Sequence, residues 1–407
     1  MRIHHTAHAL SGFPVFSAAF VADDRLVLGG GGGSSRSGVK NKLRLYNVPS
    51  DGKLELLNEL ELGKDEDSPM SMAADVYASR VLCGINSSTE QIAQGINKNC
   101  RLYDATGDEI DLLESTGTLD TPEGEEESDY QKVTVLSPGR TLACISGTKR
   151  LSLLSYPSLS RAACDLITKD EFYDASFSST KLAVATNKDF FIYSLPAAEV
   201  NEKSSSSGPK TRSKAKGRKN SKLEEQELLE AFSRPDVTGD RTGNTTLRAC
   251  RFNPVNDDII YTVSNTAPIR TKGKSKPKQG YICKWNTTTW KIVKVRKAGE
   301  KGITCFDVSP NGKYLAVGSA DCTIAILDAN TLTPLLTILK AHDFPPTVVK
   351  FNPSSKLLVS GSADNSVRLV TIPGGLAGSK WSFVNVMIFI LLTYLILRFV
   401  FSGILPL

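Results

Sequence analysis

Two segments near the carboxyl end of the chain repeat each other. They are ITCFDVSPNGKYLAVGSADCTIAILD (303–328) and VVKFNPSSKLLVSGSADNSVRLV (348–370), and matching positions such as Ser309 and Asn352 lie 43 residues apart. In each segment, an alternating strand ends at a proline turn, an apolar strand follows, and a Gly-Ser-Ala-Asp turn leads into a third strand. A period of about 40–45 residues is typical of a four-stranded propeller blade. The repeat therefore predicts an all-β fold.

Weaker copies of the unit occur upstream and bring the expected number of blades to seven. The copies cover residues 14–48, 68–107, 130–156, 171–195 and 247–286. The last unit lacks a fourth strand, and the segment Arg2–Ala9 could supply it, which would close the ring and remove exposed sheet edges. An open array of β-sandwiches is disfavoured because the repeats share one order of turns. Residues 1–373 are therefore expected to form a seven-bladed β-propeller.

The chain ends in an apolar run, Trp381–Leu407, in which Arg398 is the only charged residue. Roughly 20 apolar residues in a helix cross a bilayer core. A buried core helix would rarely be apolar on every face, and a lipid-anchor signal would need a polar spacer and a secretory signal. We therefore expect a linker at 374–380, a transmembrane helix at 381–404 and a luminal tail at 405–407, with Arg398 within or beyond the span.

The propeller is expected to lie in the cytosol. Met1–Gly12 lacks the apolar stretch of a signal peptide. Positive charge at Lys356, Arg368 and Lys380 precedes the apolar run, as cytosolic flanks prefer. The eight cysteines are scattered and form no Cys-x-x-Cys pair, so free thiols in a reducing compartment are expected.

Positive charge is concentrated in two inserts, 201–222 and 270–278. The first contains eight Lys and Arg residues and one Glu, whereas the net charge of the whole chain is +6. Their richness in Ser, Gly, Lys and Pro predicts disordered surface loops. Solvated loops are one interpretation, and attraction to anionic headgroups of the cytosolic leaflet is the alternative. Nucleic-acid binding is disfavoured because no aromatic residues alternate with the basic ones.

The sequence lacks the motifs of covalent catalysis. H-E-x-x-H, G-x-S-x-G and G-x-G-x-x-G do not occur, and the P-loop-like segment Gly33–Lys40 has Val39 where the lysine should stand. The four histidines, His4, His5, His8 and His342, are expected to be structural or exposed. We therefore expect a protein that is not an enzyme and has no small-molecule substrate.

One connection in the first blade is unusually long. Ordinary strand connections have two to five residues, whereas the segment Gly29–Leu43 starts with five consecutive glycines and ends on Lys40-Asn41-Lys42. Glycines permit positive φ angles and let backbone carbonyls and amides converge on an ion or a partner. A flexible linker is the alternative, but glycines directly at a strand end favour a shaped loop.

The order of these features resembles a known family. The motifs are Gly29–Gly33, Asn41-Lys42-Leu43, Asp67-Ser68-Pro69 and Ile92-Ala93-Gln94-Gly95, followed by the terminal apolar run. They are similar to the WD-repeat guanine-nucleotide exchange factors of the endoplasmic reticulum, which act on Sar-type small GTPases and start assembly of the COPII vesicle coat. The resemblance covers the whole chain. Lys40, where a more rigid residue would be expected, and the basic insert 201–222 depart from the family pattern.

The resemblance implies nucleotide exchange without covalent chemistry. In the family, backbone carbonyls of the loop hold a potassium ion and the loop inserts into the GTPase near its nucleotide. Carried onto this chain, Val39 would make an apolar contact, Asn41 would compete for switch or nucleotide contacts, and Asp75 would be an acidic neighbour beside the loop. The potassium would be held by the backbone of four glycines, Gly30, Gly31, Gly32 and Gly33.

The implied partners are a Sar-type GTPase, in its GDP-bound and nucleotide-free forms, and lipids of the endoplasmic reticulum membrane, with no nucleic acid. The implied location is that membrane, crossed once, with ER-to-Golgi transport as the process and cycling through the Golgi left open. The alternative function is a membrane-tethered propeller scaffold for cargo exit without exchange activity. The exchange mechanism requires tighter binding to the nucleotide-free GTPase than to the loaded form.

Overall fold

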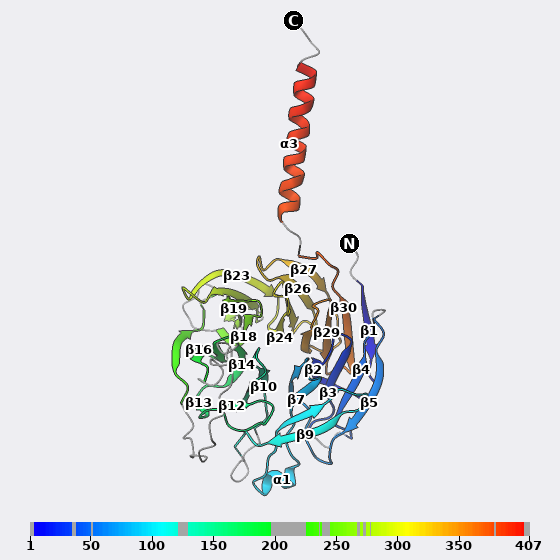
Figure 1. Cartoon of the computed structure of the whole chain (residues 1–407), viewed down its shortest axis with the longest axis vertical. Coiled ribbons are helices and arrows are strands. Elements are labelled where there is room, and N and C mark those ends of the chain that lie inside the picture. Colours follow the sequence, from blue (N-terminus) through cyan, green and yellow to red (C-terminus); the bar gives the residue numbers. More distant parts are fainter. Residues whose placement is uncertain are drawn as a thin grey trace, which may run out of the picture.

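The structure of the protein is a computed structural model. It describes residues 4–34, 38–49, 52–120, 129–196, 225–235, 237, 245–266, 269–271, 274–276, 278–377 and 380–402. Seven four-stranded antiparallel sheets are arranged in a ring (Figure 1), and their inner strands line a central channel. The seven-bladed all-β propeller predicted from the repeat is therefore confirmed. The basic insert 201–222 and the tail 405–407 lie outside the described residues.

Each blade runs from an inner strand to an outer one. The first four blades are β2 (Val15–Phe20), β3 (Arg25–Gly30), β4 (Lys42–Asn47) and β5 (Glu55–Glu61); β6 (Ser71–Asp75), β7 (Arg80–Gly84), β8 (Cys100–Asp104) and β9 (Asp111–Thr116); β10 (Val133–Leu136), β11 (Leu142–Ser146), β12 (Arg150–Ser155) and β13 (Leu166–Ile167); and β14 (Phe172–Phe177), β15 (Lys181–Thr186), β16 (Asp189–Ser194) and β17 (Leu228–Ser233).

The last three blades follow the same plan. They are β18 (Thr245–Asn253), β19 (Asn256–Thr266), β22 (Gly280–Asn286) and β23 (Lys291–Gly299); β24 (Ile303–Val308), β25 (Tyr314–Ser319), β26 (Ile324–Asp328) and β27 (Pro334–Ile338); and β28 (Pro346–Phe351), β29 (Leu357–Ser362), β30 (Ser366–Thr371) and β1 (His5–Ala9). The second basic insert was expected to be irregular, but all of its described residues except Lys278 belong to a hairpin, β20 (Ile269–Thr271) and β21 (Lys274–Lys276).

The amino-terminal strand closes the ring. β1 pairs antiparallel with β30 from His5 opposite Val370 to Ala9 opposite Ser366. The strand expected within Arg2–Ala9 thus completes the last blade and covers an edge that would otherwise expose unpaired backbone groups. Every strand of the ring therefore lies within residues 5–371.

The hydrophobic core is divided among the blade interfaces. Each of seven clusters of buried side chains draws its members from two neighbouring blades, as when Leu28 of the first blade packs with Val359 of the last. Burying one such aliphatic side chain contributes about 1.5–3 kcal/mol. Because no blade contains a core of its own, the ring is stable only when its blades pack together.

The thiols and the last histidine have structural surroundings. All eight cysteines are free, as expected, and burial raises the pKa of Cys83 and Cys144 well above the ordinary thiol range. The imidazole of His342 lies 2.8 Å from both Ser360 Oγ and Ser366 Oγ. His342 is therefore a buried structural residue that links two strands of the last blade, as predicted.

The apolar segment near the carboxyl end forms α3 (Lys380–Ser402), which contains Arg398. Leu376 and Ala377, just before it, pack against the buried cluster between the last two blades. Among the residues that the structure describes, no helix has the length and hydropathy needed to cross a bilayer. The transmembrane helix at 381–404 stays a prediction.

Strand direction separates the two faces of the ring. Because neighbouring strands are antiparallel, the connections 31–41, 62–70 and 85–99 lie on one face, which we call the glycine-loop face. α1 (Thr89–Ala93) belongs to the third of these connections. β30 ends on the opposite face, and Figure 1 shows α1 and α3 at opposite ends of the molecule.

Candidate functional site

The long connection between β3 and β4 has a defined backbone on both sides of its tip. Gly31 has a φ of +142° and Gly33 a φ of +71°, which lie in the region that favours glycine. A Cβ at Gly31 would lie 2.3 Å from Asn41 Oδ1 and 2.7 Å from the Lys40 carbonyl oxygen. Gly31 is therefore required by conformation and by space, and Gly33 is favoured by its conformation, which indicates a shaped loop. Residues 35–37, at its tip, lie outside the described residues.

Asn41 closes the base of this loop. Its Oδ1 accepts hydrogen bonds from Gly33 N at 2.9 Å and from Ser68 Oγ at 2.7 Å. Its Nδ2 donates to the carbonyl oxygens of Gly33, at 2.9 Å, and Glu66, at 2.6 Å. An amide side chain can make about four hydrogen bonds, so Asn41 is fully used. The structure thus places it as a half-buried clamp between the first two blades, and a direct contact with a partner would require breaking this set.

The second blade braces the same connection. Glu66, whose carbonyl holds Asn41, accepts hydrogen bonds at its carboxylate from Gly63 N at 2.8 Å and from the Arg101 guanidinium at 2.6 Å. The Arg101 side chain is only 9% exposed. A shielded ion pair of this kind is costly to break by removing one partner. The loop of the first blade is therefore tied to β8 of the second.

Asp67 brings a carboxylate to the loop. It accepts a hydrogen bond from Ser68 N at 2.7 Å, and its Oδ1 would lie 3.5 Å from a Cβ at Gly33. Burial raises the pKa of this carboxyl, although hydrogen bonds from Ser68 and Ser34 oppose the rise. Within the described part of the chain, no Lys, Arg or His forms an ion pair with Asp67. Asp67 is thus a half-buried carboxylate without a cation beside an oxygen-rich turn.

The sequence did not predict the roles of Glu66, Asp67 and Ser68, which hold or face the loop. The motif Asp67-Ser68-Pro69 indicated only the family resemblance. Its position directly before an inner strand was the available signal, because that connection shares a face with the loop. Val39, expected to contact the partner, is half-buried on the loop, and the neighbouring Lys40 is exposed, with its Nζ 2.8 Å from Glu61 Oε1.

Asp75 lies elsewhere, and its expected position beside the loop is wrong. β6 begins near the loop at Ser71 and runs across the ring, so that Asp75, its last residue, is at the opposite face. There its Oδ1 accepts a hydrogen bond from Tyr77 N at 3.1 Å and lies 3.5 Å from Arg140 Nε. Ser68 and Asp75 are close in sequence, but β6 lies between them and its whole length separates Asp75 from the loop.

The motif 92–95 marks the end of α1 on the glycine-loop face. Ser88 caps this short helix by accepting a hydrogen bond from Gln91 N at 3.4 Å, and Gly95 follows it with a φ of +77°. Ile92 is buried, whereas Ile96 is 47% exposed. The motifs 29–33, 67–69 and 92–95 thus lie on the glycine-loop face of the first two blades. The fourth motif, 41–43, starts at Asn41, which closes the base of the loop.

Comparison with known proteins agrees with the ring. The family model described as WD domain, G-beta repeat matches residues 290–328 and 333–370. The solved WD40 β-propeller domain of Doa1 superposes with a TM-score of 0.58 at 14% identity, covering 93% of this chain and 100% of that one. This likeness supports the fold alone.

Relatives in sequence extend along nearly the whole chain. The guanine nucleotide-exchange factor SEC12 of Candida glabrata is 24% identical over 92% of this chain and 74% of its own length. SEC12 of Mus musculus is 27% identical over 40% of this chain and 43% of its own, and SEC12-like protein 2 of Arabidopsis thaliana is 29% identical over 33% and 32%. The chain is therefore similar in sequence to SEC12 exchange factors and shares the WD40 propeller fold.

Proposed function

We propose that this protein is a guanine-nucleotide exchange factor for a small GTPase. The observation that carries the proposal is the alignment of a SEC12 exchange factor with 92% of the chain. Exchange needs no covalent chemistry, because a factor that binds the nucleotide-free GTPase more tightly than the loaded form shifts the population toward nucleotide release. The finer proposal is that the GTPase is of the Sar type and that its activation starts COPII vesicle formation.

The glycine-loop face is the surface that we assign to the GTPase. A loop that is already ordered loses less conformational entropy when it binds. The clamp formed by Asn41, Gly33 and Glu66 supplies such order at the base of the loop. Val39 would then contact an apolar surface of the GTPase. In this proposal Asn41 acts by holding the loop in shape, which replaces the direct contact expected from the sequence.

The loop has the chemistry of a site for a potassium ion. Hard cations are bound by carboxylate and carbonyl oxygens, and the Lys40 carbonyl oxygen and Asp67 Oδ1 lie beside Gly31 and Gly33. The residues therefore fit, with the backbone carbonyls of Gly30, Gly31, Gly32 and Gly33 as further ligands. A bound cation would supply the positive charge that Asp67 lacks. Asn41 and Ser68 keep this turn closed through their own hydrogen bonds.

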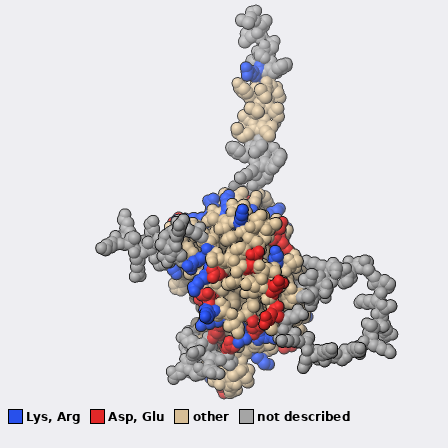
Figure 2. Space-filling model, turned by 90° about the vertical axis from the view of Figure 1, so that its left-hand side faces the viewer, with Lys and Arg blue, Asp and Glu red and all other residues tan. Residues whose placement is uncertain are grey.

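We further propose that residues 381–404 anchor the protein in the endoplasmic reticulum membrane with the propeller in the cytosol. On the side shown in Figure 2, Lys and Arg gather over the part of the ring nearest α3, whereas Asp and Glu are more frequent farther away. Basic side chains near a bilayer are attracted to anionic headgroups of the cytosolic leaflet. The chain leaves β30 on the face opposite the glycine loop, which keeps the loop face free for the GTPase.

Nucleotide release from a purified Sar-type GTPase tests the proposal. Residues 1–378 contain every strand of the closed ring and the packed residues Leu376 and Ala377, so this piece serves as the exchange factor. Release of a fluorescent GDP analogue would be timed in potassium buffer and again in sodium buffer. Fast release that slows in sodium is the expected result. A folded ring that leaves the intrinsic rate unchanged would instead support the scaffold without exchange activity.

A further inference from the structure

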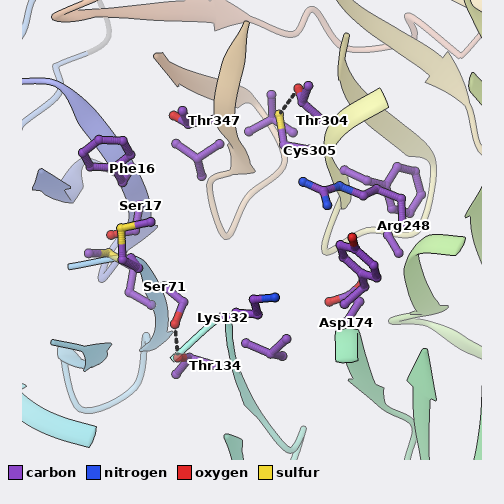
Figure 3. Close-up of a pocket in the computed structure, with 18 of the residues that line it drawn as sticks. Phe16, Ser17, Ser71, Lys132, Thr134, Asp174, Arg248, Thr304, Cys305 and Thr347 are labelled. Atoms are coloured by element: carbon purple, nitrogen blue, oxygen red, sulfur yellow. Dashed lines mark hydrogen bonds between the residues drawn. The ribbon is translucent and has the colours of Figure 1, made fainter. Parts of the chain in front are cut away.

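Five inner strands of the ring contain a bulge at the same level. The register shifts fall between Val15 and Ser17, Phe172 and Asp174, Leu247 and Ala249, Ile303 and Cys305, and Pro346 and Val348. The inserted residues are Phe16, Tyr173, Arg248, Thr304 and Thr347. A bulge turns a side chain away from its regular direction. All five inserted residues line one central cavity of about 640 Å³, and Figure 3 shows four of them, with Lys132, around it.

This cavity is the channel mouth on the glycine-loop face, because its lining residues lie at or near the starts of the inner strands. Two of the bulged residues join neighbouring blades. Thr304 Oγ1 donates to the Pro346 carbonyl oxygen at 2.6 Å, and Thr347 Oγ1 donates to the Val15 carbonyl oxygen at 2.6 Å. These hydroxyls are therefore used within the ring. Hydrogen bonds between blades explain why Thr304 and Thr347 occupy the bulges, but they do not explain the positions of Tyr173 and Arg248.

Arg248 lies over an aromatic platform. Its guanidinium carbon is 4.9 Å from the centre of the Tyr173 ring, and Lys132 Nζ is 5.6 Å from the same centre. Arginine stacked on an aromatic face keeps its planar N–H groups in one orientation. Two cations on one tyrosine ring therefore face a cavity that is open to the glycine-loop face.

Among the described residues, the charged side chains that line this cavity are paired, except for Arg248. Lys132 pairs with Glu171, Arg251 pairs with Asp174, and Lys350 Nζ lies 3.0 Å from Asp307 Oδ1. In the part of the chain that the structure describes, Arg248 has neither a carboxylate partner nor a hydrogen bond from its guanidinium. Its contact is the Tyr173 ring. The channel mouth thus presents one uncompensated cation.

We infer that this channel mouth binds the carboxylate side chain of an acidic peptide segment from a partner protein. Arginine forms two parallel hydrogen bonds with a carboxylate, and the free guanidinium of Arg248 is available for both. A cavity of this size suits a peptide side chain with its backbone, since pockets for organic ligands measure about 300–1,000 Å³. Phe16, Met70 and Tyr130 supply apolar walls. The inference goes beyond nucleotide exchange and does not rest on it.

Fluorescence anisotropy with the full chain tests the site. The probe is a fluorescein-labelled peptide, Gly-Ser-Asp-Glu-Asp-Glu-Ser-Gly, and its control has Asn and Gln in place of Asp and Glu. Arg248→Gln should weaken binding of the acidic probe by about tenfold or more, because hydrogen bonds to charged groups are among the stronger ones. The matched control is Arg296→Gln, which makes the same charge change on the exposed outer strand β23. It should bind as the unchanged protein does.

Equal affinity of Arg248→Gln and the unchanged protein would overturn the proposal, because Arg248 would then not bind the probe. Equal weakening by Arg296→Gln would also overturn it, because the probe would then be attracted by charge alone. Arg248→Lys serves as a second variant that keeps the charge, and its melting curve checks that it folds. If it melts as the unchanged protein does but binds the probe more weakly, the planar guanidinium group, and not the charge alone, recognises the carboxylate. Citrate distinguishes the source of the carboxylate. If citrate binds more tightly than the peptide and also depends on Arg248, the site is for a small acid and not for a peptide.

The chain's own acidic sequence is the other occupant to be tested. Glu123, Glu125, Glu126 and Glu127 lie outside the described residues, between β9 and β10 in the sequence. A variant with all four changed to glutamine is titrated with the same probe. Binding by both proteins supports a site for a partner. Binding by this variant alone would assign the channel to the chain itself and overturn the partner.

Discussion

The first and last blades differ at one connection. In the last blade, β29 and β30 are joined by residues 363–365, and Asp364 closes this short turn by accepting hydrogen bonds from Ser366 N at 2.9 Å and Asp343 N at 2.7 Å. In the first blade, residues 31–41 make the same connection, and Asn41 closes it through the second blade. The short turn depends on its own blade, whereas the long loop depends on its neighbour.

The two aspartates of these regions show what the difference means. Burial alone would raise the pKa of Asp364, but hydrogen bonds from Ser366 and Asp343 and the nearby His342 lower it. Burial does raise the pKa of Asp67, beside the glycine loop. Asp364 is therefore held in its charged form within the fold, whereas Asp67 accepts hydrogen bonds but has no cation beside it among the described residues. A carboxylate with a raised pKa in an ordered loop is typical of a site that binds something, which separates the structural end of the ring from the functional one.

The largest expected effect comes from opening the ring. Deletion of residues 1–9 removes β1 and its five paired positions with β30, and five net backbone hydrogen bonds contribute on the order of 5 kcal/mol. Urea denaturation followed by circular dichroism should show a much lower midpoint. Deletion of residues 1–3 alone is the control and should change little. Equal midpoints for both deletions would mean that the ring does not need its closing strand.

The next effect concerns the long loop. Asn41→Ala removes four hydrogen bonds at the loop base but no core side chain, so exchange activity should fall by about a hundredfold if roughly 2.7 kcal/mol of loop order is lost. The ring should keep its circular dichroism spectrum. Asn47→Ala, at the far end of β4 with one hydrogen bond to Glu55, is the matched control. Full exchange activity in Asn41→Ala would remove this residue from the proposed mechanism.

A smaller effect tests the structural end. Burial lowers the pKa of His342 below its ordinary 6.5, with Asp364 acting in the opposite direction. The unfolded chain therefore takes up a proton at His342 before the folded chain does, so stability is complete above pH 6.5 and falls as the pH decreases below it, by at most about 1.4 kcal/mol per pH unit. The unfolding free energy of His342→Gln should be lower at pH 7 and should decrease less between pH 6.5 and 5.5. Parallel curves would contradict this assignment.

The smallest effect sharpens the contrast between the two aspartates. Asp67→Asn removes the uncompensated charge while keeping the shape of the side chain, so the ratio of exchange rates in potassium and sodium should approach one. In sodium buffer the variant should melt at a slightly higher temperature, because a carboxyl with a raised pKa costs stability once it is ionised. Lys40→Gln, which breaks an exposed ion pair with Glu61, serves as a charge control and should keep the potassium effect. An unchanged ratio in Asp67→Asn would exclude Asp67 as a ligand.

Local patterns were sufficient to predict the architecture. The 43-residue period and its turns predicted seven blades, and an unpaired amino-terminal segment next to an incomplete last unit predicted the closing strand. Both rest on short-range features, namely strand alternation and turn residues, that each blade repeats. The five glycines likewise predicted a shaped loop, because their conformational freedom is a property of single residues.

Contacts between blades were decided only by the tertiary structure. The bonds from Asn41 to Glu66 and Ser68 join residues more than twenty positions apart, and the face on which Asp75 lies depends on the course of a whole strand. The bulges that turn Tyr173 and Arg248 into the channel arise from pairing registers. The chain by itself determined which units form, because alternation and turns act locally. The packing of the ring determined which side chains meet, because those positions depend on how neighbouring blades are rotated and staggered against each other.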